Sequence, residues 1–535
     1  MDQYLPVDLD TDMANRVLPK ILRMRAERHG DRKFLDICGQ SVSFGEMDLI
    51  SSRLARGLQK LGVARSDRVA FLLPNCFELV AIWFAVSKLG AIEVPNNRHL
   101  KGELLIHNLN NCGAELLVAD RASLTEIAKV QDSLPAIHTL VLVGARPEEA
   151  RDAGIRIDAI LSYEECVAER DDFDPVDVHY SDPMAILYTS GTTGPAKGVL
   201  MSHHHYFSWA IAMACNLGYT GNDSYFSPLP LFHADAQLFG IFMPLLFGTG
   251  STMVEGFSAS RYWDQVRQSG ATSTNLLGAM AVILMRAAPS ELDRDNPVRV
   301  CQCLPIVPDQ AAFEARFGIK LVTAYGQTET SFVTLDTVDE SRPNSCGRAH
   351  PEWEVAVVDE YDQPLPPGAV GEIVSRPRKS WSMFSGYYNQ DAKTVQALRN
   401  CWYHSGDAGE MDEDGWLYFK HRLNESIRRR GENISPYEVE TVAGGHADIV
   451  ESAAFGVPSE FTEEEIVLVA RRRAGSALSA ADLLGHFQSN APRHIVPRYI
   501  EITDLPLPRT PTEKVSRSAL KHKGITEATF DRERR

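Results

Sequence analysis

The chain has 535 residues, of which 44% are hydrophobic and 23% are charged, and its formal net charge at pH 7 is −17. This composition is typical of a soluble globular protein, and the length requires at least two domains. The negative charge argues against a nucleic acid or an anionic membrane surface as the main partner, although a local loop can still hold a nucleotide.

The nine cysteines are scattered, odd in number and without a C-x-x-C pair. Free thiols in a reducing cytoplasm are therefore expected, and Cys301 and Cys303 are interpreted as core residues, not metal ligands. The first residues lack the apolar region of a signal peptide. The longest apolar stretch, residues 229–253, is interrupted by polar residues and glycines, so it predicts buried core and pocket wall and no membrane span.

The first part of the chain alternates predicted strands and helices. Residues 44–61 predict an amphipathic helix, because Ser43 and Glu46 have capping-box spacing and apolar residues recur on one face. A largely buried helix is expected over 77–89. Short apolar runs predict strands at residues 69–73, 91–94, 116–119 and 139–143. This β-α-β rhythm predicts a parallel sheet covered by helices.

The middle of the chain continues this α/β pattern after an acidic, weakly patterned segment, 145–182, which is interpreted as a connection. Helices are expected over 202–217, 262–268 and 308–317, and strands over 184–187, 298–303 and 321–325. His203, His204 and His205 are interpreted as a solvated helix start, in preference to a metal site.

Two further parts follow. Residues 347–419 have short alternating segments and turn signals, which predict a small β-rich module. Residues 423–535 predict a separate, mobile α+β domain behind a large N-terminal body, residues 1–422, made of helix-covered sheets and the β-module.

A phosphate-binding loop is predicted at residues 188–199. Hydroxyl residues and glycines follow the strand at 184–187 and lead to Lys197. Glycines let backbone N–H groups converge on an anion, hydroxyls donate further hydrogen bonds, and the lysine adds a positive charge. The spacing differs from that of the G-x-x-x-x-G-K-[ST] loop.

Four shorter motifs follow the loop: Tyr-Gly-Gln-Thr-Glu-Thr at 325–330, Tyr-His-Ser-Gly-Asp at 403–407, a glycine turn at 430–438, and a proline-stiffened segment at 508–514 that ends in Lys514. A tyrosine ring can lie on a base, and carboxylates can hold Mg²⁺ or ribose hydroxyls. Taken singly, each of the last three motifs is more often an ordinary turn or loop.

Together and in this order, the five motifs resemble those of the adenylate-forming superfamily, which includes acyl-CoA synthetases, luciferases and peptide-synthetase adenylation domains. The resemblance covers residues 20 to 520. It implies that ATP, with Mg²⁺, activates a carboxylic acid as an acyl-adenylate with release of pyrophosphate. A thiol, usually that of CoA, then displaces AMP, and the small C-terminal domain rotates between the two half-reactions.

The resemblance also implies roles for individual residues. Glu329 matches the Mg²⁺ carboxylate, Thr328 a phosphate ligand, and Lys514 the lysine that bridges the carboxylate and the α-phosphate. Gly431 matches the turn beside the pantetheine tunnel. The remaining nucleotide contacts are the phosphate loop, the adenine-stacking tyrosine and the ribose contacts: Thr189, Ser190, Gly191, Thr192, Thr193, Gly194, Lys197, Tyr325, Asp407 and Arg422.

Within the superfamily, the run Leu-Phe-His-Ala-Asp-Ala-Gln at 231–237 looks like crotonobetaine/carnitine-type CoA ligases. His233 matches the aromatic gate of the acid site, and Gln237 and Gly278 are placed in the same pocket. Asp235 is unusual in a pocket expected to be apolar. It either meets a cationic or amino group of the substrate or is a loop carboxylate paired with a backbone donor.

The chain departs from the family pattern at a few positions, among them Glu513 before the catalytic lysine and Asn424 at the hinge. The main expectation is an acid–CoA ligase for a small or medium acid. One alternative is an adenylating enzyme whose acceptor is a carrier-protein thiol or an amine, or one that activates nitrite in place of the carboxylate, as diazo-forming relatives do. Another is an inactive nucleotide-binding scaffold. A homodimer remains open.

Overall fold

The computed structural model describes residues 5–6, 12–170, 173–189, 195–307, 309–423, 426–460, 463–509 and 515–534. The chain divides into two compact units. The first gathers the described residues of Met1–Arg98, Leu109–Tyr188 and Gly198–His421, and the second those of His99–Asn108, Thr189–Lys197 and Arg422–Arg535.

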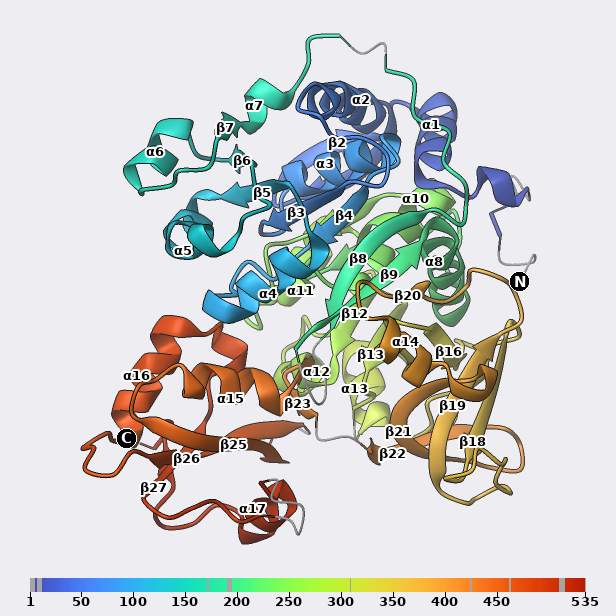
Figure 1. Ribbon diagram of the computed structural model, residues 1–535. Coiled ribbons are helices and arrows are strands. Elements are labelled where there is room, and N and C mark those ends of the chain that lie inside the picture. The colour runs from blue at the N-terminus through green and yellow to red at the C-terminus, as the bar shows by residue number, and fades with distance from the viewer. Residues whose placement is uncertain are drawn as a thin grey trace. The chain divides into compact units, whose positions relative to one another are not determined.

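An eight-stranded sheet forms one layer of the first unit (Figure 1), in the order β20-β9-β8-β4-β3-β5-β6-β7. Its inner strands are parallel, with Val69 opposite both Glu93 and Leu116. The predicted strands and their parallel arrangement are confirmed. The bounds are β3 (Arg68–Leu72), β4 (Ile92–Pro95), β5 (Leu116–Asp120), β6 (Thr139–Val143), β7 (Ala159–Ser162), β8 (Pro183–Thr189), β9 (Lys197–Ser202) and β20 (Gly386–Tyr387).

A second sheet of seven strands has the order β14-β13-β12-β10-β11-β1-β2 and is parallel except for the β1–β2 pair. Cys301 and Cys303 lie on its strand β13 and are fully buried, as expected for core residues. The bounds are β1 (Lys33–Ile37), β2 (Gln40–Ser43), β10 (Tyr225–Ser227), β11 (Ser251–Met253), β12 (Ser273–Leu277), β13 (Val300–Leu304) and β14 (Lys320–Val322).

Helices accompany these strands along the chain. Helix α2 begins at Phe44 after a complete capping box of Ser43 and Glu46, as predicted. The helix bounds are α1 (Leu18–His29), α2 (Phe44–Lys60), α3 (Phe77–Lys88), α4 (Gly102–Cys112), α5 (Leu124–Val130), α8 (His203–Leu217), α11 (Tyr262–Ser269), α12 (Gly278–Arg286), α13 (Gln310–Phe317) and α14 (Asp391–Ala397).

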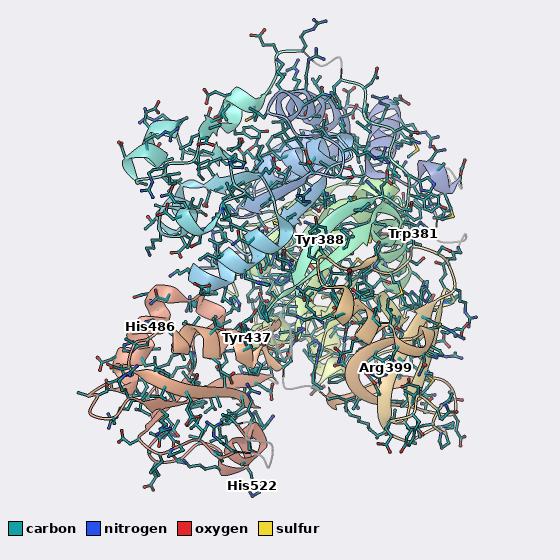
Figure 2. The ribbon with its side chains drawn as sticks, viewed as in Figure 1. Trp381, Tyr388, Arg399, Tyr437, His486 and His522 are labelled. Carbon is teal, nitrogen blue, oxygen red and sulfur yellow. The ribbon has the colours of Figure 1, made fainter. Side chains whose placement is uncertain are left out.

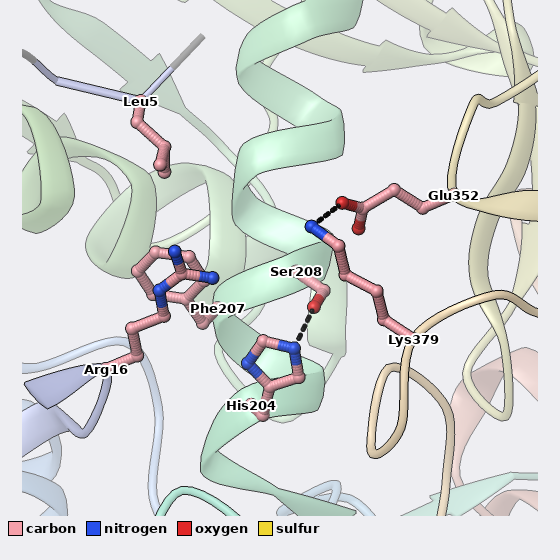
Figure 3. Close-up of a pocket in the computed structure, with 7 residues that line it drawn as sticks. All are labelled: Leu5, Arg16, His204, Phe207, Ser208, Glu352 and Lys379. Carbon is pink, nitrogen blue, oxygen red and sulfur yellow. Dashed lines mark hydrogen bonds and ion pairs between the residues drawn. The ribbon is translucent and has the colours of Figure 1, made fainter. Parts of the chain in front are cut away.

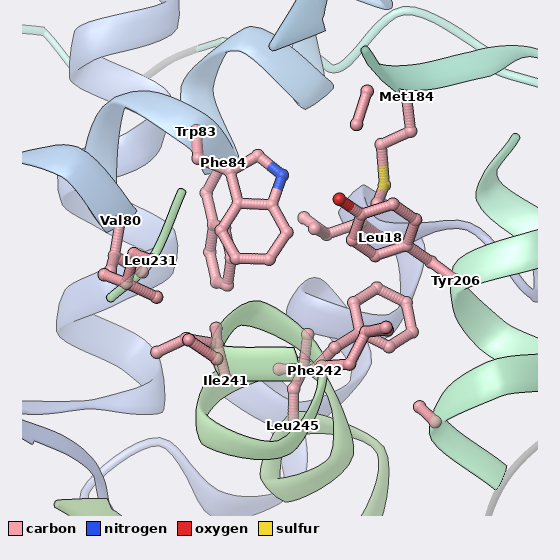
Figure 4. Packing of buried hydrophobic residues seen from close by; sticks show 14 of the residues in the cluster. Leu18, Val80, Trp83, Phe84, Met184, Tyr206, Leu231, Ile241, Phe242 and Leu245 are labelled. Atoms are coloured by element: carbon pink, nitrogen blue, oxygen red, sulfur yellow. The ribbon is translucent and has the colours of Figure 1, made fainter. Parts of the chain in front are cut away.

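The core of the first unit lies where α3, α8 and the 229–253 stretch meet (Figure 4). The rings of Trp83 and Tyr206 are 6.1 Å apart, and Tyr206 lies 5.9 Å from Phe242. The stretch folds into α9 (Ala234–Gln237), a π-helical turn (Leu238–Phe242) and α10 (Met243–Phe247). The prediction that 229–253 is largely buried is therefore confirmed, and burial of each large side chain contributes roughly 2–3 kcal/mol.

Two sequence predictions for the first unit need correction. The segment 145–182 is more than a connection, because it contains α6 (Pro147–Asp152), α7 (Tyr163–Cys166) and strand β7, which pairs in parallel with β6. The three histidines do begin α8, capped by Ser202, but they are buried instead of solvated. A capping pattern specifies where a helix begins and carries no information about what covers it.

Two antiparallel sheets complete the first unit. The predicted β-module is confirmed as β18 (Trp353–Val358), β19 (Gly371–Pro377), β21 (Tyr403–Met411) and β22 (Leu417–Arg422). A smaller sheet contains β15 (Ala324–Gln327), β16 (Ser331–Leu335) and β17 (Arg348–Ala349). These two sheets carry the motifs at 325–330 and 403–407.

The second unit has its own core, around α15 (Pro436–Gly444), α16 (Ala480–Asn490) and a four-stranded sheet. Ser435 and Glu438 cap α15 reciprocally, and Tyr437 is exposed in its first turn (Figure 2). The other elements are β23 (Ile427–Arg429), β24 (Glu432–Ile434), β25 (Ile449–Pro458), β26 (Glu464–Arg472), β27 (Tyr499–Thr503), α17 (Arg517–Lys523) and β28 (Phe530–Asp531). The expected α/β architecture with an α+β C-terminal part is confirmed. Among the described residues, no helix combines the length and the hydropathy needed to cross a membrane.

Candidate active site

The hairpin β15–β16 presents the motif at 325–330. Glycine is required at position 326, because a Cβ there would lie 1.8 Å from the carbonyl oxygen of Ser331. The strands can approach this closely only without a side chain, and the pairing register shifts between Tyr325 and Gly326. Tyr325 and Gln327 flank the glycine, and Thr328 and Glu329 lie in the turn that follows.

A hydrogen-bond network joins this hairpin to β21. The hydroxyl of Tyr325 donates to Oδ2 of Asp407 at 2.7 Å, and Nε2 of Gln327 donates to the same oxygen at 2.9 Å. Gln327 Nε2 also donates to the carbonyl of Ser405 at 3.0 Å, and Gln327 Oε1 accepts from the hydroxyl of Tyr403 at 2.6 Å. Two motifs that lie about eighty residues apart in the chain are thus held together.

Gln327 and Tyr403 belong to these motifs, but neither was predicted to have a role of its own. The available signal was spacing, since Gln327 lies two residues from Tyr325 on one strand and Tyr403 lies four residues from Asp407 on another. That signal is weak without knowledge that β15 and β21 meet.

Glu329 is 5% exposed and is held by a second tyrosine. The hydroxyl of Tyr387 donates to Oε1 of Glu329 at 2.8 Å, and the backbone N–H of Phe384 donates to the carbonyl of Glu329 at 2.8 Å. Burial, together with the nearby Glu329 carboxylate, raises the pKa of Tyr387, so its hydroxyl remains a donor at neutral pH.

This carboxylate fits a magnesium ion bound together with nucleotide phosphates. Mg²⁺ prefers oxygen ligands and is usually held by one or two carboxylates, phosphates and water, without an all-protein cage. Within the described ranges, no cluster of three or more histidine, cysteine or acidic side chains forms such a cage.

The phosphate-loop motif lies between two adjacent strands. Thr189 ends β8 and Lys197 begins β9, and the hydroxyl of Thr189 donates to the carbonyl of Lys197 at 3.5 Å. His107 on α4 donates from Nε2 to the carbonyl of Ala196 at 2.9 Å. Several predicted residues lie outside the described residues: Ser190, Gly191, Thr192, Thr193, Gly194, Asn424, Glu513 and Lys514.

The residues predicted for the acid pocket lie on two elements. His233 is the N-cap of α9, and Asp235 lies in its first turn, both half-buried. Gly278 begins α12, where a Cβ would lie 2.7 Å from the carbonyl of Pro305. That contact leaves no room for a side chain at 278.

Gln237 is fully buried in a polar cluster of its own. Its Oε1 accepts from the hydroxyl of Tyr206 at 2.5 Å, and its Nε2 donates to the carbonyl of Leu231 at 2.9 Å and lies 3.4 Å from Glu93. Burial raises the pKa of the Glu93 carboxyl well above its ordinary value. Gln237 therefore ties the two ends of the 231–237 loop together.

In the second unit, Gly431 lies in the two-residue turn between β23 and β24. Arg430 and Gly431 have φ of 52° and 83°, as a type I′ hairpin turn requires. The N–H of Gly431 donates to both carboxylate oxygens of Glu463, at 3.1 and 3.0 Å. Arg422 ends β22 and is half-buried.

A separate small cavity lies beside α8 (Figure 3), lined by Leu5, Arg16, His204, Phe207, Ser208, Glu352 and Lys379. Its interior volume is about 10 Å³, roughly the room that one water molecule needs. His204 is paired with Ser208 at 3.2 Å, and Lys379 with Glu352. The cavity is too small for a nucleotide or an organic acid.

Comparison with known proteins agrees with this fold. The AMP-binding enzyme family matches residues 22–388, and the C-terminal domain of AMP-binding enzymes matches residues 438–514. The chain belongs to this family of adenylate-forming acyl-CoA ligases. The resemblance to crotonobetaine/carnitine-type ligases is also confirmed, because the chain is 33% identical over 486 residues to the crotonobetaine/carnitine–CoA ligase of Salmonella heidelberg, with 87% of this chain and 91% of that protein covered.

Solved structures support the same architecture. The o-succinylbenzoate CoA synthetase of Bacillus subtilis has a TM-score of 0.79 at 24% identity, with 94% of this chain and 98% of that chain covered. The amide bond synthetase of Marinactinospora thermotolerans has a TM-score of 0.78 at 24% identity, with coverages of 94% and 99%. At this identity the two structures establish the fold, while the acid and the acceptor have to be inferred from the site.

Proposed function

We propose that this protein uses ATP and Mg²⁺ to activate a small or medium carboxylic acid as an acyl-adenylate, and that it then transfers the acyl group to the thiol of CoA. The network of Tyr325, Gln327 and Asp407 carries this proposal, because it holds a tyrosine ring and a carboxylate in one place. These are the two groups that adenine and ribose require.

The proposal assigns each group a task. The ring of Tyr325 lies on adenine, Asp407 and Arg422 bind the ribose, and Glu329 holds Mg²⁺ with Thr328 on a phosphate. The loop from Thr189 to Lys197 binds the β- and γ-phosphates. Neutralising the phosphates lets an anionic carboxylate attack the α-phosphorus, and pyrophosphate leaves.

The second half-reaction belongs to the other face of the C-terminal domain, which we propose to be mobile and to span residues 423–535. Lys514 on this domain orients the acid and the α-phosphate during adenylation. Gly431 then lines the path of the CoA thiol, which attacks the acyl carbon while AMP leaves. His233, Asp235, Gln237 and Gly278 shape the acid site.

The test is release of AMP and pyrophosphate over a panel of acids, including crotonobetaine, carnitine, aromatic acids and amino acids. Each acid is assayed with CoA, without CoA, and with nitrite plus an aryl amine. Pyrophosphate release followed by CoA-dependent AMP release supports the ligase. If AMP is released with nitrite and an aryl amine but not with CoA, CoA is not the acceptor. If no acid is adenylated in any of the three assays, the proposal is overturned.

A further inference from the structure

We propose that Gln327 is a positioning residue, which fixes the carboxylate of Asp407 and, through it, the ring of Tyr325 for the adenine nucleotide. This inference rests on the proposed function, in which Tyr325 and Asp407 contact that nucleotide. It adds a residue that has no contact with substrate of its own.

The orientation of the Gln327 amide is forced by its neighbours. Nε2 faces the Asp407 carboxylate at 2.9 Å and the Ser405 carbonyl at 3.0 Å, and both of these groups only accept hydrogen bonds. Oε1 lies 2.6 Å from the hydroxyl of Tyr403, which donates to it. A flipped amide would set its oxygen against two acceptors, so only this orientation is stable.

Tyr403 anchors the far side of the amide. It is 3% exposed, and burial raises the pKa of its phenol well above the ordinary value. Its hydroxyl therefore keeps its proton and donates to Gln327 throughout the pH range in which the enzyme would work. Because Tyr403 and Asp407 share β21, the glutamine of β15 is bound to this strand at three points.

The Asp407 carboxylate depends on this arrangement. Asp407 is 1% exposed, and a buried carboxylate is stable as an anion only when donors surround it. Its Oδ2 receives both the Tyr325 hydroxyl and the Gln327 amide, which are fixed relative to each other by β15. Removal of the amide takes away one of these two donors, so the carboxylate can rotate and the tyrosine ring can follow it.

Both N–H groups and the carbonyl oxygen of the Gln327 amide thus have protein partners. A residue of this kind affects the affinity for the adenine nucleotide. It leaves the rate of the chemical step, the acid site and the acceptor site unchanged. We expect its loss to weaken nucleotide binding specifically.

The experiment compares Gln327→Met with the wild-type full-length enzyme. Methionine keeps the length of the side chain and removes the amide. AMP affinity is measured by titration calorimetry, and KM for ATP, KM for the acid and kcat are measured by pyrophosphate release. Loss of a hydrogen bond to a charged group predicts AMP binding weaker by about tenfold or more, an equal rise in KM for ATP, and a nearly constant KM for the acid.

Gln310→Met is the matched control. The amide of Gln310 also donates to a carboxylate, that of Glu314 at 2.9 Å, and to a backbone carbonyl, that of Leu321 at 3.3 Å, outside the nucleotide network. It should leave AMP affinity unchanged. If Gln327→Met does not fold, Tyr403→Phe is used, with about three- to tenfold weaker AMP binding expected and Tyr418→Phe, whose hydroxyl contacts Asp412, as its control.

The outcomes separate the inference from the proposed function. Wild-type enzyme that binds no adenine nucleotide overturns the proposed function and the inference with it. Wild-type binding with unchanged affinity in the variant overturns the inference alone. A parallel rise in KM for ATP and KM for the acid, with a lowered melting temperature, would show a purely structural role and would also overturn it.

Discussion

The hydroxyl of Tyr387 donates a 2.8 Å hydrogen bond to Oε1 of Glu329, which fixes a buried carboxylate two residues from Gln327. We expect Glu329→Gln to abolish adenylation or to raise the Mg²⁺ concentration at half-maximal rate by at least about tenfold, because the ion loses its charged ligand. Tyr387→Phe should also raise the Mg²⁺ concentration at half-maximal rate, but by a smaller factor. Pyrophosphate release measured against Mg²⁺ concentration is the readout.

Glu340→Gln is a suitable control for this series, since Glu340 is an exposed carboxylate paired with Arg348. If Glu329→Gln has the wild-type dependence on Mg²⁺ concentration, Glu329 is not a ligand of the metal ion.

The two half-reactions should respond differently to Lys514. We expect Lys514→Ala to slow pyrophosphate release by about a hundredfold or more, because in the proposed function this lysine orients both reactants. Attack of CoA on a preformed acyl-adenylate should continue at close to the wild-type rate. Lys521→Ala, which removes an exposed lysine of α17, should change neither. Equal losses in the two half-reactions would contradict a division of labour within the C-terminal domain.

Substitution of Asp235 tests whether the substrate acid carries a cationic or amino group. If its carboxylate meets a cationic or amino group, Asp235→Ala should lower kcat/KM for such acids by about tenfold relative to neutral acids of the same size. Asp235→Asn keeps the shape and should show most of the same loss. A variant with the wild-type acid profile would identify Asp235 as a loop carboxylate with a structural partner.

The buried His205 should make the free energy of unfolding depend on pH on the acid side. Burial, and then the neighbouring His204, lowers the pKa of His205 from 6.5 to about 3. A lowered histidine pKa means that the unfolded chain binds the proton first, so stability is full above pH 6.5 and falls as the pH drops toward 3. For a single group this loss is about 2 kcal/mol at pH 5.

His205→Phe should abolish this contribution, since phenylalanine can keep the stacking on Trp209, 5.9 Å away, and takes up no proton. The difference in unfolding free energy between variant and wild type, measured by urea denaturation, should therefore grow in favour of the variant between pH 7.5 and pH 5. A pH-independent difference would mean that His205 is protonated equally in both states.

Local patterns were sufficient for much of the fold. The capping box of Ser43 and Glu46 predicted the start of α2, and short apolar runs predicted strands such as β6 with its observed bounds. These signals succeed because they depend on neighbours in the sequence. The edge strand β7 escaped detection, since its apolar run of Ala159, Ile160 and Leu161 is only three residues long and lies within an acidic segment.

The site was predicted in its parts, and its assembly was not. The motifs at 325–330 and 403–407 stood out by composition, but the contact of Gln327 with Tyr403 depends on two different sheets meeting. The prediction that His203 is solvated was wrong for the same reason. The segment that covers it includes Leu18, whose backbone N–H donates to His203 and which lies 185 residues away in the chain. Burial and contact are properties of the whole chain.

The missing side chain at position 326 restricts how this enzyme can be altered. Any replacement there would push a carbon into the backbone of the facing strand, so we expect substitutions at this position to disrupt the hairpin that carries Tyr325 and Gln327. Variation at positions 325 and 327 does not meet this steric limit, so libraries are better directed there.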